Sequence, residues 1–296
     1  MSAPKGKLII IGGSVDKGSF SQNPENLPKS LKFFEKGILK RMIDESAKGN
    51  LSRIEIITTA SNIPAEVGQE YIDAFKHLNV ANTAVLDIRT REQANQPHNI
   101  QRLRDADVVM FTGGDQLRLT SIFGGTEFHH LLLERYANDN FIISGTSAGA
   151  AASSNNMIYQ GSSQEALLKG EVKITGGLGF INNVIIDTHF VQRGRIGRLL
   201  YACASNPVNL GIGLGEDTGL LITDGNIMEA IGSGLVILVD GTKMRNTNIT
   251  EVAIGEPVSI DNITVHVIAY GDRFDLKTKR LTLKGLKNEE EILDLT

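Results

Sequence analysis

The sequence contains a single cysteine, Cys203, so no internal disulfide can form. Cysteine usage this low fits a reducing compartment, and we expect the protein in the cytoplasm. The surrounding sequence, Leu-Leu-Tyr-Ala-Cys-Ala, is typical of a helix face, where an unpaired cysteine is usually a small buried apolar residue. We therefore assign Cys203 no catalytic role.

Long hydrophobic runs and an excess of basic residues are also missing. The longest apolar runs, such as 8–11 and 235–239, are far shorter than the roughly 20 residues of a membrane-spanning helix. They are also shorter than the apolar part of a secretory signal, about 7–15 residues. The 30 Lys and Arg against 34 Asp and Glu give a net charge of −4, whereas nucleic-acid-binding proteins usually show a basic surface. We expect neither a membrane nor a nucleic acid as partner.

Two kinds of cofactor motif are absent. No His, Cys and Asp residues stand at metal-ligand spacing, such as H-E-x-x-H. Gly12 and Gly13 follow an apolar run, but G-x-G-x-x-G, the dinucleotide-binding pattern, does not occur there. We expect neither a metal nor another cofactor.

What is present is an alternation of short apolar runs and longer amphipathic stretches. Near-continuous Val, Ile, Leu and Phe content is typical of strands buried on both faces. The predicted strands are 7–12, 53–59, 83–88, 107–112 and 141–144, and the helices between them are 31–48, 65–78, 99–106 and 127–137. This order predicts an α/β fold with a mostly parallel central sheet and helices on both faces.

The last third of the chain has a different pattern. A strand at 184–187 precedes a polar segment and a helix through Leu199 and Ala204. Short strands separated by Asp-Gly and similar turns then favour hairpins; they lie at 209–214, 219–223, 227–231, 235–239 and 264–269. No linker separates the two parts. We expect one domain over 1–296, with a parallel core at 1–215 and a β-rich part at 216–296.

The strongest local motif is Gly145-Thr146-Ser147-Ala148-Gly149, which directly follows a predicted strand. It has the G-x-S-x-G form of a nucleophile elbow, where a strained turn exposes the serine and side chains two residues away would clash. Ser147 is then a candidate nucleophile, and the Ala148 N–H would face a developing oxyanion. The same residues would also suit a small-residue turn without chemistry.

A serine nucleophile needs a base and an orienting carboxylate. His189 lies just past the predicted strand 184–187, at the edge where ligands bind in open α/β sheets. Glu216 and Asp217 follow the next strand, and either can orient the imidazole, although an acidic turn before a hairpin is the alternative. We expect Ser147 and these residues on one edge of the sheet. The other histidines suit surface or packing positions: His77, His98, His129, His130 and His266.

Two further features suggest substrate binding. Arg193, Arg195 and Arg198 do not share one helix stripe, and the glycines between them allow their guanidiniums to converge. Arginine suits carboxylate or phosphate recognition, but structural ion pairs or a nucleic-acid patch are alternatives. Asp187 can balance the arginines or bind a cationic group of the substrate. At the end of another strand, Gly114 can present a second oxyanion N–H.

Four segments together resemble the cyanophycinase family, serine exopeptidases of the peptidase E clan with a glutamine-amidotransferase-like, flavodoxin-like α/β fold. They are FTGGDQLRL at 111–119, GTSAGA at 145–150, DTHFVQRGRIGRL at 187–199 and GIGLGED at 211–217. The resemblance implies Ser147 as nucleophile, His189 as base and Glu216, not Asp217, as its partner. It also implies that Gln116, Asp187 and the three arginines contact the substrate. Thr188 stands where the family is expected to carry glutamine.

The resemblance implies a substrate as well. It is cyanophycin, a polyaspartate with arginine on each β-carboxylate, cleaved to β-Asp-Arg dipeptides through an acyl-enzyme. A peptidase E-like dipeptidase for short β-aspartyl peptides is the alternative enzyme. A non-catalytic module that binds an anionic ligand through the arginines is the alternative of another class. The family and the free edge of the β-rich part also lead us to expect a homodimer.

Overall fold

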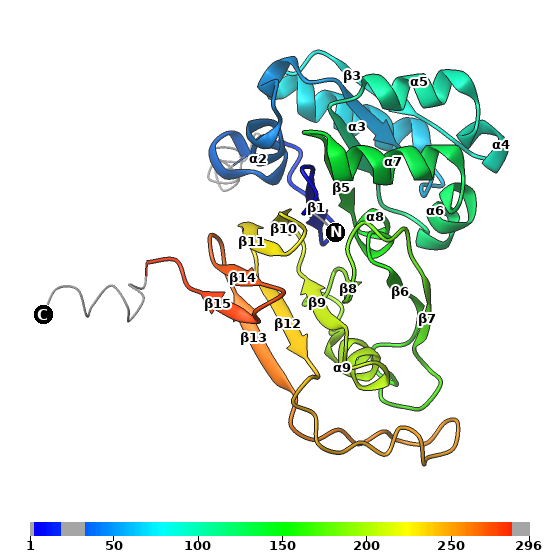
Figure 1. The fold of residues 1–296 in the computed structure, drawn as a ribbon, viewed down its shortest axis with the longest axis vertical. Helices are drawn as coiled ribbons and strands as arrows, with labels where there is room; N and C mark the ends of the chain where they lie inside the picture. The colour runs from blue at the N-terminus through cyan, green and yellow to red at the C-terminus, as the bar shows by residue number, and fades with distance from the viewer. Residues whose placement is uncertain (1–2, 19–32, 286–296) are drawn as a thin grey trace, which may run out of the picture.

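The computed structural model describes residues 3–18 and 33–285. Its largest element is a nine-stranded sheet in the order β15-β14-β11-β10-β1-β5-β4-β2-β3 (Figure 1). Five neighbouring strands are mutually parallel: β1 (Lys7–Ile11), β5 (Ile142–Thr146), β4 (Val108–Phe111), β2 (Ile54–Ile57) and β3 (Thr83–Leu86). The predicted parallel core is confirmed, and each strand lies within two residues of its expected ends at most.

Helices cover both faces of the parallel strands, because side chains alternate along each strand. Leu8 and Ile10 of β1 point into one apolar cluster, and Ile9 and Ile11 point into another. The first cluster is covered by α5 (Pro97–Asp105), α6 (Gln116–Phe123) and α7 (Glu127–Asn138), and the second by α2 (Ile38–Glu45) and α3 (Pro64–His77). The predicted helix 31–48 is interrupted at Gly37: residues 33–36 are helical, and α2 follows and ends at Glu45. Residues 31 and 32 lie outside the described residues.

The antiparallel part is also confirmed. It continues the large sheet beyond β1 through β10 (Thr218–Thr223), β11 (Ile227–Gly232), β14 (Arg273–Asp275) and β15 (Arg280–Thr282). The last two strands are only three residues long and largely polar, so the apolar pattern did not predict them. Also unpredicted are α4 (Arg91–Ala94), α6, the 3-10 turn Gly49–Leu51 and the hairpin of β6 (Asn156–Gln160) and β7 (Lys173–Gly176).

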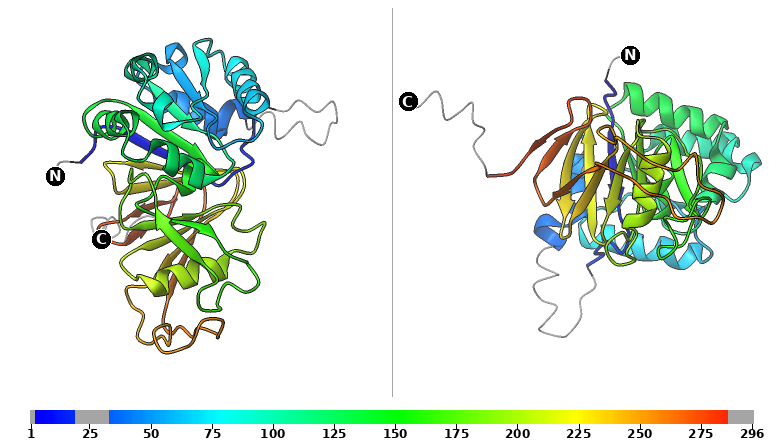
Figure 2. Two further views of the ribbon diagram at one scale, coloured as in Figure 1. Left: turned by 90° about the vertical axis from the view of Figure 1, so that its right-hand side faces the viewer. Right: turned by 90° about the horizontal axis from the view of Figure 1, so that it is seen from below.

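A second sheet corrects one sequence-based expectation. β8 (Val184–Asp187) and β9 (Leu210–Leu214) do not join the central sheet; with β12 (Val236–Asp240) and β13 (Thr264–Ile268) they form a separate four-stranded sheet in the order β13-β12-β9-β8. Figure 2 shows it beside the large sheet, with α9 (Ile196–Ser205) against it. His189 therefore follows a strand of a different sheet from Ser147. A buried apolar run has the same composition in either sheet, so composition could not separate the two arrangements.

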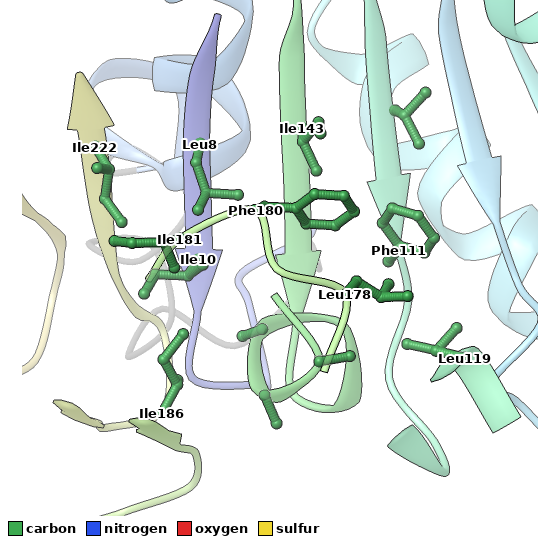
Figure 3. Close-up of a cluster of buried hydrophobic side chains, with 14 of the residues drawn as sticks. Leu8, Ile10, Phe111, Leu119, Ile143, Leu178, Phe180, Ile181, Ile186 and Ile222 are labelled. Atoms are coloured by element: carbon green, nitrogen blue, oxygen red, sulfur yellow. The ribbon is translucent and has the colours of Figure 1, made fainter. Parts of the chain in front are cut away.

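The two sheets share one apolar core. Figure 3 shows Ile186 of β8 in the same cluster as Leu8 and Ile10 of β1 and Ile222 of β10. Phe180 belongs to this cluster too and packs near Phe111 at the end of β4. This packing holds the ends of β1, β5, β8 and β9 close together. Within the described residues, no helix is long and apolar enough to cross a membrane.

Candidate active site

Ser147 stands in a left-handed turn between β5 and α8 (Ala148–Ala151), with φ 50° and ψ −106°. Its backbone N–H donates to the Ile11 carbonyl at 2.9 Å, which fixes the turn against β1. The glycines on either side are needed for space. A Cβ on Gly145 would lie 2.4 Å from the Gly149 backbone, and one on Gly149 would lie 2.6 Å from the Phe111 carbonyl oxygen. The strained turn is that of a nucleophile elbow.

His189 reaches Ser147 from the second sheet. Its Nε2 lies 3.1 Å from the Ser147 Oγ. The residue has φ 49°, and its N–H donates to the Gly12 carbonyl at 2.8 Å. Gly13, with φ 113°, lies against the imidazole, where an added Cβ would be 2.4 Å from Cε1. The turn after β8 is thus held against the turn after β1, and this contact brings the ring to the serine.

Glu216 completes the line of hydrogen bonds. Its Oε1 lies 2.7 Å from His189 Nδ1. The hydrogen bond from His189 lowers the pKa of Glu216, and the Ser14 hydroxyl acts in the same direction, so the carboxylate stays ionised. An ionised Glu216 holds the proton on Nδ1 and leaves the Nε2 lone pair facing the serine hydroxyl.

Asp217, the other acidic candidate, does not contact the imidazole in this way. Its Oδ1 accepts from the Asp16 N–H at 3.0 Å, and its Oδ2 accepts from the Ser233 hydroxyl at 2.6 Å. The structure therefore places Glu216, and not Asp217, at His189.

The arginine cluster converges on Asp187. Arg195 Nη1 donates to Asp187 Oδ1 at 3.1 Å and to the Thr188 carbonyl at 2.8 Å. Arg198 Nε lies 3.1 Å from Asp187 Oδ2, and its Nη1 donates to the Gly161 carbonyl at 3.1 Å. Burial raises the pKa of Asp187, while the charges of both arginines oppose the rise. Of the two roles expected for Asp187, the structure gives it the balancing one.

The three arginines differ in exposure. The Arg198 side chain is 7% exposed and the Arg195 side chain 16% exposed, whereas Arg193 is an exposed residue. Arg198 therefore lies inside the protein, between β8 and the loop after β6. Of these three arginines, Arg193 is the exposed residue and the one most accessible to a ligand.

The remaining predicted residues lie on the neighbouring turns. Gln116 begins α6, and its Nε2 donates to the Ile158 carbonyl at 3.1 Å; Thr188 is buried beside Asp187. Gly114 has φ 138°, and an added Cβ would lie 2.1 Å from the Ala60 carbonyl oxygen. The neighbouring Gly113 lies next to the serine, since its added Cβ would be 3.4 Å from Ser147 Cβ.

Several residues that the sequence did not single out also shape the site. Gly12, Gly13 and Ser14 contact His189 or Glu216, and the Gln192 side chain accepts from the Glu216 N–H at 3.1 Å. The signal available in the sequence is Gly12-Gly13 at the end of the first strand, a pair that by itself suggests only a weak dinucleotide-binding loop. Within the described residues, no group of three or more His, Cys, Asp and Glu side chains could hold a metal ion.

Serine-type hydrolases join a serine hydroxyl, an imidazole and a carboxylate in this order. Comparison with known proteins supports the same class. The model of peptidase family S51 matches residues 32–230. The chain belongs to this family and is a serine-type peptidase.

Named relatives and a solved structure extend the comparison. The chain is 35% identical, over 93% of its length and 87% of theirs, to cyanophycinases of Trichormus variabilis and Nostoc sp.. It is 34% identical to the cyanophycinase of Geminocystis herdmanii, over 95% of that protein. The fold resembles the crystal structure of a peptidase from an acI-B1 Actinobacterium, with a TM-score of 0.62 at 20% identity, over 93% of this chain and 98% of that one.

Proposed function

We propose that the protein is a cyanophycinase, a serine exopeptidase that hydrolyses the aspartyl backbone of cyanophycin (multi-L-arginyl-poly-L-aspartate) to β-Asp-Arg dipeptides. The observation that carries the proposal is the hydrogen-bonded line from Ser147 through His189 to Glu216. The cyanophycinases at 31–35% identity over most of the chain support the choice of substrate.

The reaction begins at the serine hydroxyl. Ser147 Oγ attacks the backbone carbonyl of a terminal aspartyl unit while His189 Nε2 takes its proton. Glu216 stabilises the imidazolium that forms. The N–H groups of Ala148 and of the Gly113–Gly114 turn, predicted at Gly114, hold the tetrahedral oxyanion, each contributing about 3 kcal/mol to the transition state. His189 then protonates the leaving amine, and water, activated by the same imidazole, hydrolyses the acyl-enzyme.

The substrate has both charges in each repeat, a guanidinium and a free carboxylate. Asp187 pairs with both Arg195 and Arg198 and neutralises one of their two positive charges. We assign the substrate carboxylate to exposed Arg193 with the outer edge of Arg195, where positive charge remains. Gln116 and Thr188 stand beside them as polar contacts. Arg198 acts indirectly, by holding Asp187 in place.

The test is incubation of the protein with purified cyanophycin and mass spectrometry of the soluble products. We expect β-Asp-Arg dipeptides from the wild type and none from Ser147→Ala, because the attacking oxygen is missing. Thermal unfolding of both proteins controls for folding. A Ser147→Ala protein as active as the wild type would overturn the assignment.

One observation favours a second candidate substrate. Thr188 stands where the family is expected to carry glutamine, and a threonine neither reaches as far nor donates an amide N–H. A peptidase E-like dipeptidase acting on short β-aspartyl peptides would keep the same three residues. Cleavage of such dipeptides without any release from cyanophycin would select this alternative.

We also infer that the enzyme acts in the cytoplasm as a homodimer. The single, buried Cys203 supports a reducing compartment. The end strand of the second sheet, β13, supports association, because its Val265 and Val267 side chains are 48% and 55% exposed. An exposed apolar edge strand readily pairs with another chain.

A further inference from the structure

We propose that Asp217 is a positioning residue, whose carboxylate holds the Glu216 turn and the Gly12–Asp16 loop in the arrangement that aligns His189. The proposal rests on the proposed function, because it assumes that Ser147, His189 and Glu216 act as a triad.

The carboxylate of Glu216 needs such support. Glu216 lies on a turn after β9, not in a strand, and its side chain is 35% exposed. Few packed neighbours therefore fix its rotamer, and its place depends on the backbone that carries it. That backbone is held on one side by Gln192, whose side chain accepts from the Glu216 N–H. The other side is held through the next residue, Asp217.

Asp217 joins three segments that are distant in the sequence. Its Oδ1 accepts from the Asp16 N–H at 3.0 Å, and its Oδ2 accepts from the Ser233 hydroxyl at 2.6 Å. Its backbone N–H donates to the Gly13 carbonyl at 2.9 Å, and its carbonyl accepts from the Ser233 N–H at 2.8 Å. The residue thus ties the Glu216 turn to the first loop and to the turn between β11 and β12.

The first of these segments leads directly to the imidazole. Within the Gly12–Asp16 loop, the Gly12 carbonyl accepts from the His189 N–H and Gly13 packs against the ring. The Ser14 hydroxyl lies near Glu216 and helps to lower the pKa of its carboxyl group. Asp217 holds the far end of this loop at the Asp16 N–H. Loss of its carboxylate would weaken the support of both partners of the His189 ring, Glu216 on one side and the loop on the other, although the backbone hydrogen bonds of Asp217 would remain.

A purely structural role for Asp217 is the competing explanation, because the residue has φ 47°. Aspartate and asparagine tolerate this left-handed conformation better than most residues, so the turn alone could require it. Two substitutions separate the roles. Asp217→Gly keeps the left-handed turn and the backbone hydrogen bonds, and it removes the side-chain hydrogen bonds to Asp16 and Ser233. Asp217→Asn keeps the turn, an acceptor for the Asp16 N–H and a donor to the Ser233 oxygen.

Asp224 offers a matched control. It has φ 53° in the turn between β10 and β11, at the opposite end of β10 from the site, and it is exposed. Asp224→Gly repeats the change of residue type at the same backbone conformation, away from His189. Ser233→Ala is a second test at an exposed residue, because it removes the hydrogen bond to Asp217 Oδ2 and leaves the Asp217 residue in place.

The experiment measures the rate at which a fluorophosphonate reagent labels Ser147 in the full-length protein, beside kcat and KM for dipeptide release and the thermal midpoint. We expect Asp217→Gly to lower the labelling rate and kcat by roughly 10- to 100-fold, with KM nearly unchanged. Asp217→Asn should recover most of the rate, Ser233→Ala should show a smaller loss, and Asp224→Gly should match the wild type.

Two results would overturn the proposal, and they are distinguishable. Labelling of Asp217→Gly at the wild-type rate would refute the positioning role alone. Absence of any labelling at Ser147 in the folded wild type would refute the triad and the positioning role with it. An equal loss of labelling rate in Asp217→Asn and Asp217→Gly would also count against the proposal. Hydrogen bonding by the side chain would then not account for the loss.

Discussion

At the scale of single residues, the site depends on an unusual concentration of left-handed backbone. Ser147, His189, Asp217 and Ser14 all have φ between 45° and 50°, and Gly13 has φ 113°. Such conformations are costly for residues other than glycine and tend to occur where function requires them. These turns place Ser147 and His189 against each other, set Gly13 against the imidazole, and let Asp217 bind the first loop and Ser233.

Gly13→Ala is expected to damage activity more than stability. The new Cβ would meet His189 Cε1 at 2.4 Å, so the imidazole must move away from the serine. A displacement of about 1 Å can lower kcat by roughly 100-fold, whereas the strained backbone costs about 1–3 kcal/mol. Dipeptide release and thermal unfolding measure the two effects separately.

Gly49→Ala provides the control for that experiment. Gly49 also has a positive φ, 52°, but an added Cβ there has nothing within 4 Å. The Gly49→Ala variant should lose some stability and keep full activity. Equal kcat in the two variants would show that contact with the imidazole is not what requires glycine at position 13.

The candidate residues were largely predictable because their chemistry stands in recognisable turns. Ser147 was marked by its flanking glycines and His189 by its place after a strand. The choice between Glu216 and Asp217 could not be made from spacing, because adjacent residues in a turn point in different directions. The contribution of Gly13 was hidden as well, since a glycine has no side chain to suggest which ring will lie against it.

At the scale of elements, α7 is joined to the segment before β8 by a half-buried histidine. His129 Nδ1 accepts from the Gly125 N–H at 3.2 Å, and Nε2 lies 2.7 Å from the Leu178 carbonyl oxygen. Both contacts suit the neutral ring, which accepts at one nitrogen and donates at the other. Burial lowers the pKa of His129, although the Leu178 contact opposes this shift.

This histidine should make the fold sensitive to mild acid. The unfolded chain binds a proton at His129 near pH 6.5, while the folded chain resists it, so stability is full above that pH and falls as the pH drops below it. We expect the free energy of unfolding of the wild type to fall more between pH 7 and pH 5 than that of His129→Gln, as measured by urea denaturation.

His130→Gln is the matched control, because His130 is the adjacent residue of α7 and is exposed. This variant should keep most of the acid sensitivity of the wild type, because the charge of His130 contributes less than burial to the lowered pKa of His129. The explanation fails if His129→Gln and the wild type lose the same free energy over this pH range.

Most strands could also be predicted from the sequence, but their division into two sheets could not. β1 to β5 were found because strands buried on both faces are almost wholly apolar. The β6–β7 hairpin was missed because its strands are mixed in polarity, with exposed residues along most of β7. The division into two sheets was not predicted because β8 and β9 are as apolar as β1. Composition alone does not show which strands pair with each other.

At the scale of the whole molecule, the site belongs to neither sheet alone. Ser147 follows a strand of the large sheet, His189 and Glu216 follow strands of the small one, and the Gly12–Asp16 loop lies between them. The apolar core in Figure 3 runs through both sheets and fixes their relative position. The 3.1 Å separation of serine and imidazole is therefore a property of how the sheets pack.

Assembly of two copies should depend on β13. We expect the wild type to sediment as a dimer and the double variant Val265→Lys, Val267→Lys as a monomer, because charges on an edge strand oppose pairing with another chain. Leu51→Lys, at a residue that is 81% exposed on a distant turn, should leave the dimer intact. Analytical ultracentrifugation distinguishes the forms, and a monomeric wild type would contradict the inference.

The central place of β1 has a consequence for how the enzyme is made. Its partners on either side, β5 and β10, are synthesised about 130 and about 210 residues after it. At roughly 5–20 residues per second, the second partner leaves the ribosome between about 10 and 40 s later. Until then the strand Lys7–Ile11 lacks its neighbour β10, and the site that contains the Gly12–Asp16 loop is incomplete. A nascent chain therefore gains its peptidase activity only after β10 has left the ribosome.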